Sequence, residues 1–304
     1  MSRPPSLALA PNCRAHSLNT ARGTFAVLDA RPLPGTSEQG TVLLMPGFIG
    51  SKEDFLPLLA PLASAGFRAV AVDGRGQYES DGPGSESAYA QRELAADVMA
   101  QTLALTAGAP HPAVHLLGHS LGGLIGRAAV LDVAPAPCPW ASLTLLASGP
   151  AAVCPEQQVR LQHLLGALPA VGMETVWQEL HRIERYGELP QDVEEFLRRR
   201  WFGTDPRQLL AAGRQLLVEP DRVDALAAAG LPVHVVSGSE DYAWPVTWQD
   251  AMATRLGARR TVIAGGSHSP QVEFPAETAA ALVSFWTSVE SGDRRRPVGM
   301  GLQM

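Results

Sequence analysis

The feature that most constrains the fold is a series of short apolar runs separated by longer stretches with helical spacing. After residue 40, each run of five or six mostly apolar residues is followed by a stretch whose apolar residues recur every three or four positions. Such alternation is typical of parallel strands that helices cover on both faces. The runs are residues 41–45, 68–72, 113–117, 142–147, 232–236 and 260–264. An α/β fold with a mostly parallel sheet is therefore predicted.

The segments around these runs predict a hairpin and several helices. Residues 12–32 alternate loosely and contain the turn formers Asn19 and Gly23, so an N-terminal β-hairpin is expected. A further helix is marked by Phe55 and Leu62, and Asp54 is the candidate for its N-cap. Other helical patterns cover residues 87–105, 121–133, 246–256 and 276–289.

One long interval breaks the alternation. Residues 151–230 contain no strand-like run and only helical stripes. We expect residues 1–150 and 231–291 to form the α/β core, and residues 151–230 to form a helical cap or lid over the carboxyl edge of the sheet. The alternative is a set of extra packing helices. Residues 292–304 are rich in Gly, Pro and Arg and are predicted to be a disordered tail.

Composition excludes several classes of protein. The 304 residues are 46% hydrophobic and 18% charged, with a net charge of −6, as in an ordinary globular protein. No dense basic stripe precedes residues 294–296, so nucleic acid is not expected as a partner. Three scattered cysteines favour a reducing compartment. Because no apolar stretch reaches 18 residues and no signal peptide is evident, we expect a cytoplasmic protein without membrane partners.

The sharpest local motif is G-x-S-x-G at Gly118, Ser120 and Gly122, directly after an apolar run and before a helical pattern. A sharp turn from strand to helix needs small residues on either side of the serine, and it lifts the hydroxyl clear of the sheet. The following helix then presents free N–H groups to a developing oxyanion. The alternative interpretation is a Gly-rich turn with an incidental serine.

A serine hydroxyl needs a base and an orienting acid to act as a nucleophile at neutral pH. Glu240 and Asp241 follow the run at residues 232–236, and His268 follows the run at residues 260–264. The carboxyl ends of parallel strands share one edge, so these side chains are expected to meet Ser120. Spacing alone leaves both carboxylates open as the acid.

In these motifs the chain resembles the α/β-hydrolase fold proteins, from about residue 41 to residue 289. The elbow at Ser120 matches, as do the turn from Gly238 through Asp241 to Pro245 and the late G-x-x-H segment at His268. The resemblance implies a mostly parallel sheet flanked by helices, with an inserted helical cap. It also implies nucleophilic attack by Ser120, proton transfer through His268 and orientation of the imidazole by Asp241, which favours Asp241 over Glu240.

The resemblance also assigns the oxyanion hole and a structural loop. The backbone N–H groups of Phe48 and Leu121 are the expected donors, although Pro46 stands where the family usually has histidine. Residues 73–80 resemble the family's D-x-R-G-x-G-x-S loop, with Tyr78 at a position that is usually glycine. We expect that loop to be structural.

Four further residues are candidates for substrate binding: His119, Trp177, Trp201 and Tyr242. His119 is expected to pack or hydrogen-bond near the site rather than to act as the base. The apolar side chains predicted for the cap favour a hydrophobic substrate. His163 and His181 lack metal-ligand spacing, so neither a metal nor a cofactor is expected.

These residues predict a serine hydrolase that cleaves an ester, thioester or amide of a small hydrophobic substrate through an acyl-enzyme on Ser120. Serine at the elbow disfavours the family's epoxide hydrolases and haloalkane dehalogenases, which need aspartate there. The alternatives are a carbon–carbon bond hydrolase, an acyltransferase, a cofactor-free oxygenase or lyase on the same triad, and a non-catalytic ligand-binding protein. The oligomeric state stays open.

Overall fold

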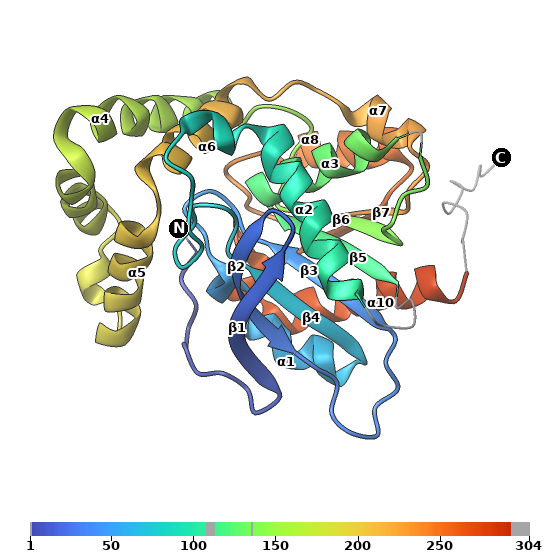
Figure 1. The fold of residues 1–304 in the computed structure, drawn as a ribbon. Coiled ribbons are helices and arrows are strands. Elements are labelled where there is room, and N and C mark those ends of the chain that lie inside the picture. The colour runs from blue at the N-terminus through green and yellow to red at the C-terminus, as the bar shows by residue number, and fades with distance from the viewer. Residues whose placement is uncertain (1, 108–112, 135, 293–304) are drawn as a thin grey trace.

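The computed structural model describes residues 2–107, 113–134 and 136–292. Within these residues, eight strands form one sheet in the order β1-β2-β4-β3-β5-β6-β7-β8 (Figure 1). The pairs β1–β2 and β2–β4 are antiparallel, and the pairs from β4 through β3 to β8 are parallel. The predicted hairpin and mostly parallel sheet are confirmed. The strands are β1 (Cys13–Thr20), β2 (Gly23–Ala30), β3 (Gly40–Met45), β4 (Phe67–Val72), β5 (Val114–His119), β6 (Ser142–Leu146), β7 (Val233–Gly238) and β8 (Arg259–Ile263).

Helices cover both faces of the sheet, because consecutive residues of a central strand point to opposite faces and both sets are apolar. In β3, Val42 and Leu44 pack into the cluster that contains α1 and α10, whereas Leu43 and Met45 pack into the cluster of α2, α3 and α8. All four side chains are buried. The helices of these two layers are α1 (Leu56–Ser64), α2 (Gln91–Thr106), α3 (Leu121–Val133), α8 (Val246–Leu256) and α10 (Pro275–Glu290).

Between β6 and β7 the chain forms only helices, which lie in the interval 151–230, hereafter called the helical insertion. They are α4 (Pro155–Ile183), α5 (Gln191–Gly203), α6 (Pro206–Val218) and α7 (Val223–Ala228), with the short 3₁₀ helix η3 (Tyr186–Glu188). α4 and α5 extend away from the sheet layers (Figure 1). α4 bends at Gly172, whose φ is 79°. α7 differs from the others, because Val223 and Leu226 pack into the core cluster beside α3 and α8.

Three short helices join these elements: η1 (Lys52–Phe55), η2 (Glu86–Tyr89) and α9 (Pro270–Glu273). Asp54 lies inside η1 and does not cap α1, whose N-cap residue is Phe55. The expectation for Asp54 was wrong because the turn closes as a 3₁₀ helix before α1 begins. Of the predicted tail, only Gly292 lies within the described residues. No helix in the described ranges is long and apolar enough to cross a lipid bilayer.

Candidate active site

The turn at Ser120 joins β5 to α3 in a strained conformation. Ser120 has φ 53° and ψ −118°, which for a residue other than glycine costs about 1–3 kcal/mol. Its N–H donates to the Leu146 carbonyl over 2.9 Å. A Cβ on Gly118 would lie 2.2 Å from the Gly122 oxygen, and one on Gly122 would lie 2.4 Å from the Met45 oxygen. Only glycine fits these two positions, as the motif predicted.

His268 lies between Ser120 and Asp241. Its Nε2 is 3.0 Å from the Ser120 Oγ, and its Nδ1 is 2.9 Å from Oδ1 of Asp241. The three residues follow β5, β7 and β8, and His268 is separated along the chain from Ser120 by 148 positions and from Asp241 by 27. The hydroxyl can donate to Nε2 only when Nδ1 carries the proton that Asp241 accepts. This arrangement can move a proton from the hydroxyl to the imidazole.

Asp241 is held as a carboxylate by its neighbours. Its Oδ1 also accepts from the Ala243 N–H over 2.9 Å, and its Oδ2 accepts from the Gln249 amide over 2.9 Å. Burial alone would raise the pKa of Asp241, but the hydrogen bonds and the attraction of His268 hold that pKa below its usual value. Glu240 is exposed and is not the hydrogen-bond partner of His268. Gln249, on α8, belongs to no motif, and sequence reasoning missed it.

His119 is a neutral residue that holds the backbone of His268. Its Nε2 donates to the His268 carbonyl over 2.8 Å, and the two rings are 5.2 Å apart. Burial and the neighbouring His268 lower the pKa of His119 to about 3. A neutral imidazole bonded to a carbonyl does not accept a proton from Ser120, so the geometry agrees with packing and hydrogen bonding.

The turn after β3 passes directly over the Ser120 turn. A Cβ on Gly47 would lie 3.0 Å from the Ser120 Cβ. Ile49 adopts a positive φ of 58°, which turns the chain toward η1. Within the described residues, no hydrogen-bond acceptor is found for the backbone N–H of Phe48 or of Leu121. Free N–H groups beside Ser120 could donate hydrogen bonds to an oxyanion that forms there.

The loop of residues 73–80 forms hydrogen bonds with the turn that follows β3. The Gln77 amide donates to the Gly47 carbonyl over 3.0 Å, and Oδ1 of Asp73 accepts from the Lys52 backbone N–H over 2.7 Å. The Lys52 ammonium is buried, 2.8 Å from Asp73 and 4.7 Å from the centre of the Tyr78 ring. Burial alone lowers the pKa of Lys52, but its acidic neighbours raise it overall. The loop is structural, and Tyr78 covers this ion pair.

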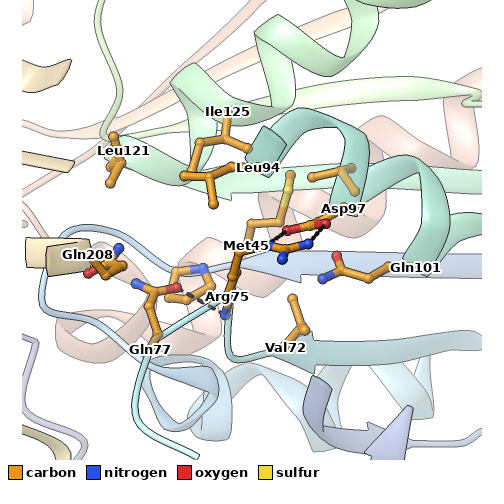
Figure 2. A pocket seen from close by; sticks show the side chains of 13 residues that line it. Met45, Val72, Arg75, Gln77, Leu94, Asp97, Gln101, Leu121, Ile125 and Gln208 are labelled. Atoms are coloured by element: carbon orange, nitrogen blue, oxygen red, sulfur yellow. Dashed lines mark hydrogen bonds and ion pairs between the residues drawn. The ribbon is translucent and has the colours of Figure 1, made fainter. Parts of the chain in front are cut away.

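A small inner cavity of about 30 Å³ has Leu121, Met45 and Leu94 among its lining residues (Figure 2). The buried amide oxygens of Gln101 and Gln208, which line it, have no hydrogen-bond partner in the described part of the chain. Arg75 and Asp97, which also line it, form an ion pair. The volume is enough for about one water molecule. Ser120, Asp241 and His268 do not line this cavity, so it is distinct from the candidate site.

A larger cleft of about 150 Å³ opens at Ser120. His119, His268, Phe48 and the half-exposed Tyr242 line it, and the Tyr242 ring lies 5.1 Å from the His268 ring. The other lining residues are Ser2, Gly47, Ile49, Asp54, Val153, Gln157, Leu161, Leu216, Ala243 and Ser269. Of the four sequence candidates for substrate binding, His119 and Tyr242 therefore reach the cleft.

Trp177 and Trp201 do not line the cleft. Both are buried in the apolar cluster of the helical insertion, and the Trp201 indole donates to the Met173 carbonyl over 3.0 Å. They hold the insertion together because their large rings fill its interior. Ser2, Asp54 and Ser269 do line the cleft, and sequence reasoning missed them. No cluster of three or more metal-ligating side chains occurs among residues 2–107, 113–134 and 136–292.

Comparisons with known proteins agree with this architecture. A model of the alpha/beta hydrolase family matches residues 42–281. A protein named "Putative carbamate hydrolase RutD" from Variovorax paradoxus (strain S110) is 39% identical over 112 residues, which are 37% of this chain and 39% of that protein. The chain thus matches about two fifths of that relative's length.

The likeness to solved structures covers a larger share of the chain. A thermophilic esterase from Thermogutta terrifontis is 21% identical with a TM-score of 0.70, covering 91% of this chain and 99% of its own. The esterase EaEST from Exiguobacterium antarcticum is 18% identical with a TM-score of 0.71, covering 90% and 100%. At this level of identity the likeness establishes the shared fold.

Proposed function

The chain belongs to the alpha/beta hydrolase family, and from that premise we propose that it is a serine hydrolase that cleaves an ester, thioester or amide. The observation that carries the proposal is the pair of short contacts of His268, 3.0 Å to the Ser120 hydroxyl and 2.9 Å to the Asp241 carboxylate. The strained turn that places Ser120 in the cleft lining supports it.

In the proposed reaction, the Ser120 Oγ attacks the substrate carbonyl while its proton passes to Nε2 of His268. Asp241 holds the imidazole in the required tautomer and stabilises the imidazolium. The N–H groups of Phe48 and Leu121 stabilise the developing oxyanion. His268 then protonates the leaving group, which departs and leaves an acyl-enzyme. Water, deprotonated by His268, attacks the acyl carbonyl and releases the acid and the Ser120 hydroxyl.

We propose that the substrate is small and uncharged. The cleft is only about 150 Å³, and Phe48, Val153 and Leu161 are among its apolar lining residues. Its described lining includes no Lys or Arg side chain that could hold a carboxylate. The helical insertion supplies Val153, Leu161 and Leu216 to this lining, which supports a role as a cap over the reactive serine.

Replacement of the nucleophile tests the proposal. Ser120→Ala should lower the hydrolysis of p-nitrophenyl acetate by about 10⁶-fold in kcat, because removal of a triad serine leaves only the contribution of the remaining site. A fluorophosphonate probe should label wild-type protein at Ser120, located by mass spectrometry, and should not label the variant. Ser284→Ala, an exposed serine on α10, is the matched control. Equal turnover by Ser120→Ala and wild-type protein would exclude the proposed nucleophile.

A second candidate is the cleavage of a carbamate, and the partial likeness to the protein named as a carbamate hydrolase favours it. A carbamate presents the same carbonyl to Ser120, with nitrogen on the acyl side. Comparing kcat/KM for matched p-nitrophenyl acetate and p-nitrophenyl carbamate separates the two. A carbon–carbon bond hydrolase or a lyase would turn over neither compound, whereas an acyltransferase would be recognised by the transfer of the acyl group to an added alcohol.

A further inference from the structure

The first residues of the chain, residues 2–7, lie between the helical insertion and the core and are called the N-terminal arm below. The Ser2 hydroxyl is buried and lies 2.9 Å from the hydroxyl of Ser269, the residue that follows His268 in the sequence. Arg3 pairs with Glu184 and stacks on the Tyr186 ring, both in the insertion. In Figure 1 the N-terminus lies between α5 and the sheet. Through these two residues the arm contacts both the loop that carries His268 and the helical insertion.

A buried ion pair fixes this arrangement. Nη1 of Arg200, on α5, donates to Oδ1 of Asp54 over 2.7 Å, and both side chains are almost fully buried. Nη2 of Arg200 donates to the Ser2 carbonyl over 3.0 Å. The backbone N–H of Ser51 donates to Oδ2 of Asp54 over 3.3 Å. Because Arg200 is held by Asp54, the position of Ser2 is set by Arg200 at its carbonyl and by Ser269 at its hydroxyl.

The same residues form one wall of the cleft. Ser2, Asp54 and Ser269 line the cleft beside Ser120. These three residues, without Ser120, are hereafter called the polar wall. The apolar lining residues Val153, Leu216 and Ala243 belong to a different cluster, which packs around α3 and Trp244. The cleft thus has chemically distinct walls, and only the polar wall contains part of the N-terminal arm.

Resting on the proposed serine hydrolase function, we propose that the N-terminal arm limits the length of the leaving group that the site accepts. His268 must donate its Nε2 proton to the leaving group, so that group lies beside His268 during the reaction. Ser269 follows His268 directly, and Ser2 is bonded to Ser269. A longer alcohol chain extending past His268 meets Ser2, whose backbone Arg200 holds in place.

Substitution of Ser2 by a bulky residue tests this inference. The substrates are methyl, butyl and hexyl acetate, which differ only in the leaving alcohol, and the readout is the ratio of kcat/KM for hexyl acetate to that for methyl acetate. Ser2→Phe should lower this ratio at least about tenfold relative to wild type, because apolar pockets discriminate by roughly that factor per methylene or more. Ser6→Phe is the matched control, since Ser6 lies in the same arm and is exposed. Its ratio should match wild type.

Removal of residues 2–4 should change the ratio in the opposite direction. Deletion opens the polar wall, so hexyl acetate should gain relative to methyl acetate. The two variants act oppositely, and the Ser2→Phe result decides the proposal even if the deleted protein does not fold. An unchanged hexyl-to-methyl ratio in Ser2→Phe overturns it. The proposal is also overturned if Ser2→Phe changes only the dependence of kcat/KM on acyl length in a series of p-nitrophenyl esters. That result would place the arm beside the acyl group.

Failure of this inference is distinguishable from failure of the proposed function. If a fluorophosphonate does not label Ser120 in wild-type protein and no acetate is hydrolysed, the serine hydrolase proposal fails and the inference falls with it. If Ser120 is labelled and the acetates are hydrolysed, but Ser2→Phe and Ser6→Phe have equal ratios, only the role of the arm is overturned.

Discussion

The proposed catalytic residues Ser120 and His268 line the same cleft as the polar wall, but the chain brings the two groups together in different ways. Ser120, Asp241 and His268 each follow a strand in the parallel part of the sheet, so the sheet itself brings them to one edge. The polar wall joins segments without a shared element: Ser2 bonds to Ser269, 267 positions away, and Asp54 bonds to Arg200, 146 positions away. We infer that local sequence motifs determine the class of reaction, whereas contacts between distant segments determine the shape of the cleft that receives the substrate.

The largest expected effect is a loss of turnover when Asp241 is replaced. Asp241→Asn should lower kcat for p-nitrophenyl acetate by about 10⁴-fold, because an amide favours the wrong imidazole tautomer. Glu240→Gln is the matched control, because Glu240 is the neighbouring carboxylate and is exposed. Its substitution should leave kcat unchanged. Stopped-flow or steady-state kinetics of both variants measures the difference. Equal losses in the two variants would remove Asp241 from its proposed role.

The polar wall should respond through stability. Arg200→Met should lower the free energy of unfolding by about 3–5 kcal/mol, because it leaves the buried Asp54 carboxylate without its partner. Arg198→Met, on the same helix but with an exposed side chain, should change it by less than about 0.5 kcal/mol. Urea unfolding followed by circular dichroism measures both. Similar values for the two variants would show that the buried Arg200–Asp54 pair does not stabilise the fold.

The same contrast explains what the sequence could and could not predict. The strands, the hairpin and the turn at Ser120 follow from local patterns, because period, glycine placement and apolar runs directly reflect backbone geometry. Asp54 was misplaced as a helix cap, since a capping carboxylate and a buried ion-pair partner look alike in sequence. Trp177 and Trp201 were expected at the substrate, but large apolar side chains give no sign of whether they face a cleft or fill an interior. Gln249 carries no motif at all.

Gln249 provides the smallest and most specific test, because it bonds to Asp241 without belonging to any sequence motif. Its amide donates to Oδ2 of Asp241 and to the Trp244 carbonyl from the interior of α8. Gln249→Ala should lower the free energy of unfolding at pH 7 by about 1.5–3 kcal/mol, the usual contribution of a hydrogen bond to a charged group. Thr247→Ala, exposed on the same helix, should cause little change.

The pH dependence of that difference identifies its origin. The folded-state pKa of Asp241 lies below its unfolded value, so the stability that Asp241 contributes is fully present above the unfolded pKa of about 3.9 and is lost as the pH falls through the folded pKa. The gap between wild type and Gln249→Ala should therefore be constant from pH 7 to pH 5 and should narrow toward about pH 3. Urea midpoints across this range measure it. A gap that stays constant at acid pH would assign the contribution of Gln249 to the Trp244 carbonyl and to packing, and would leave the charge on Asp241 to its other partners.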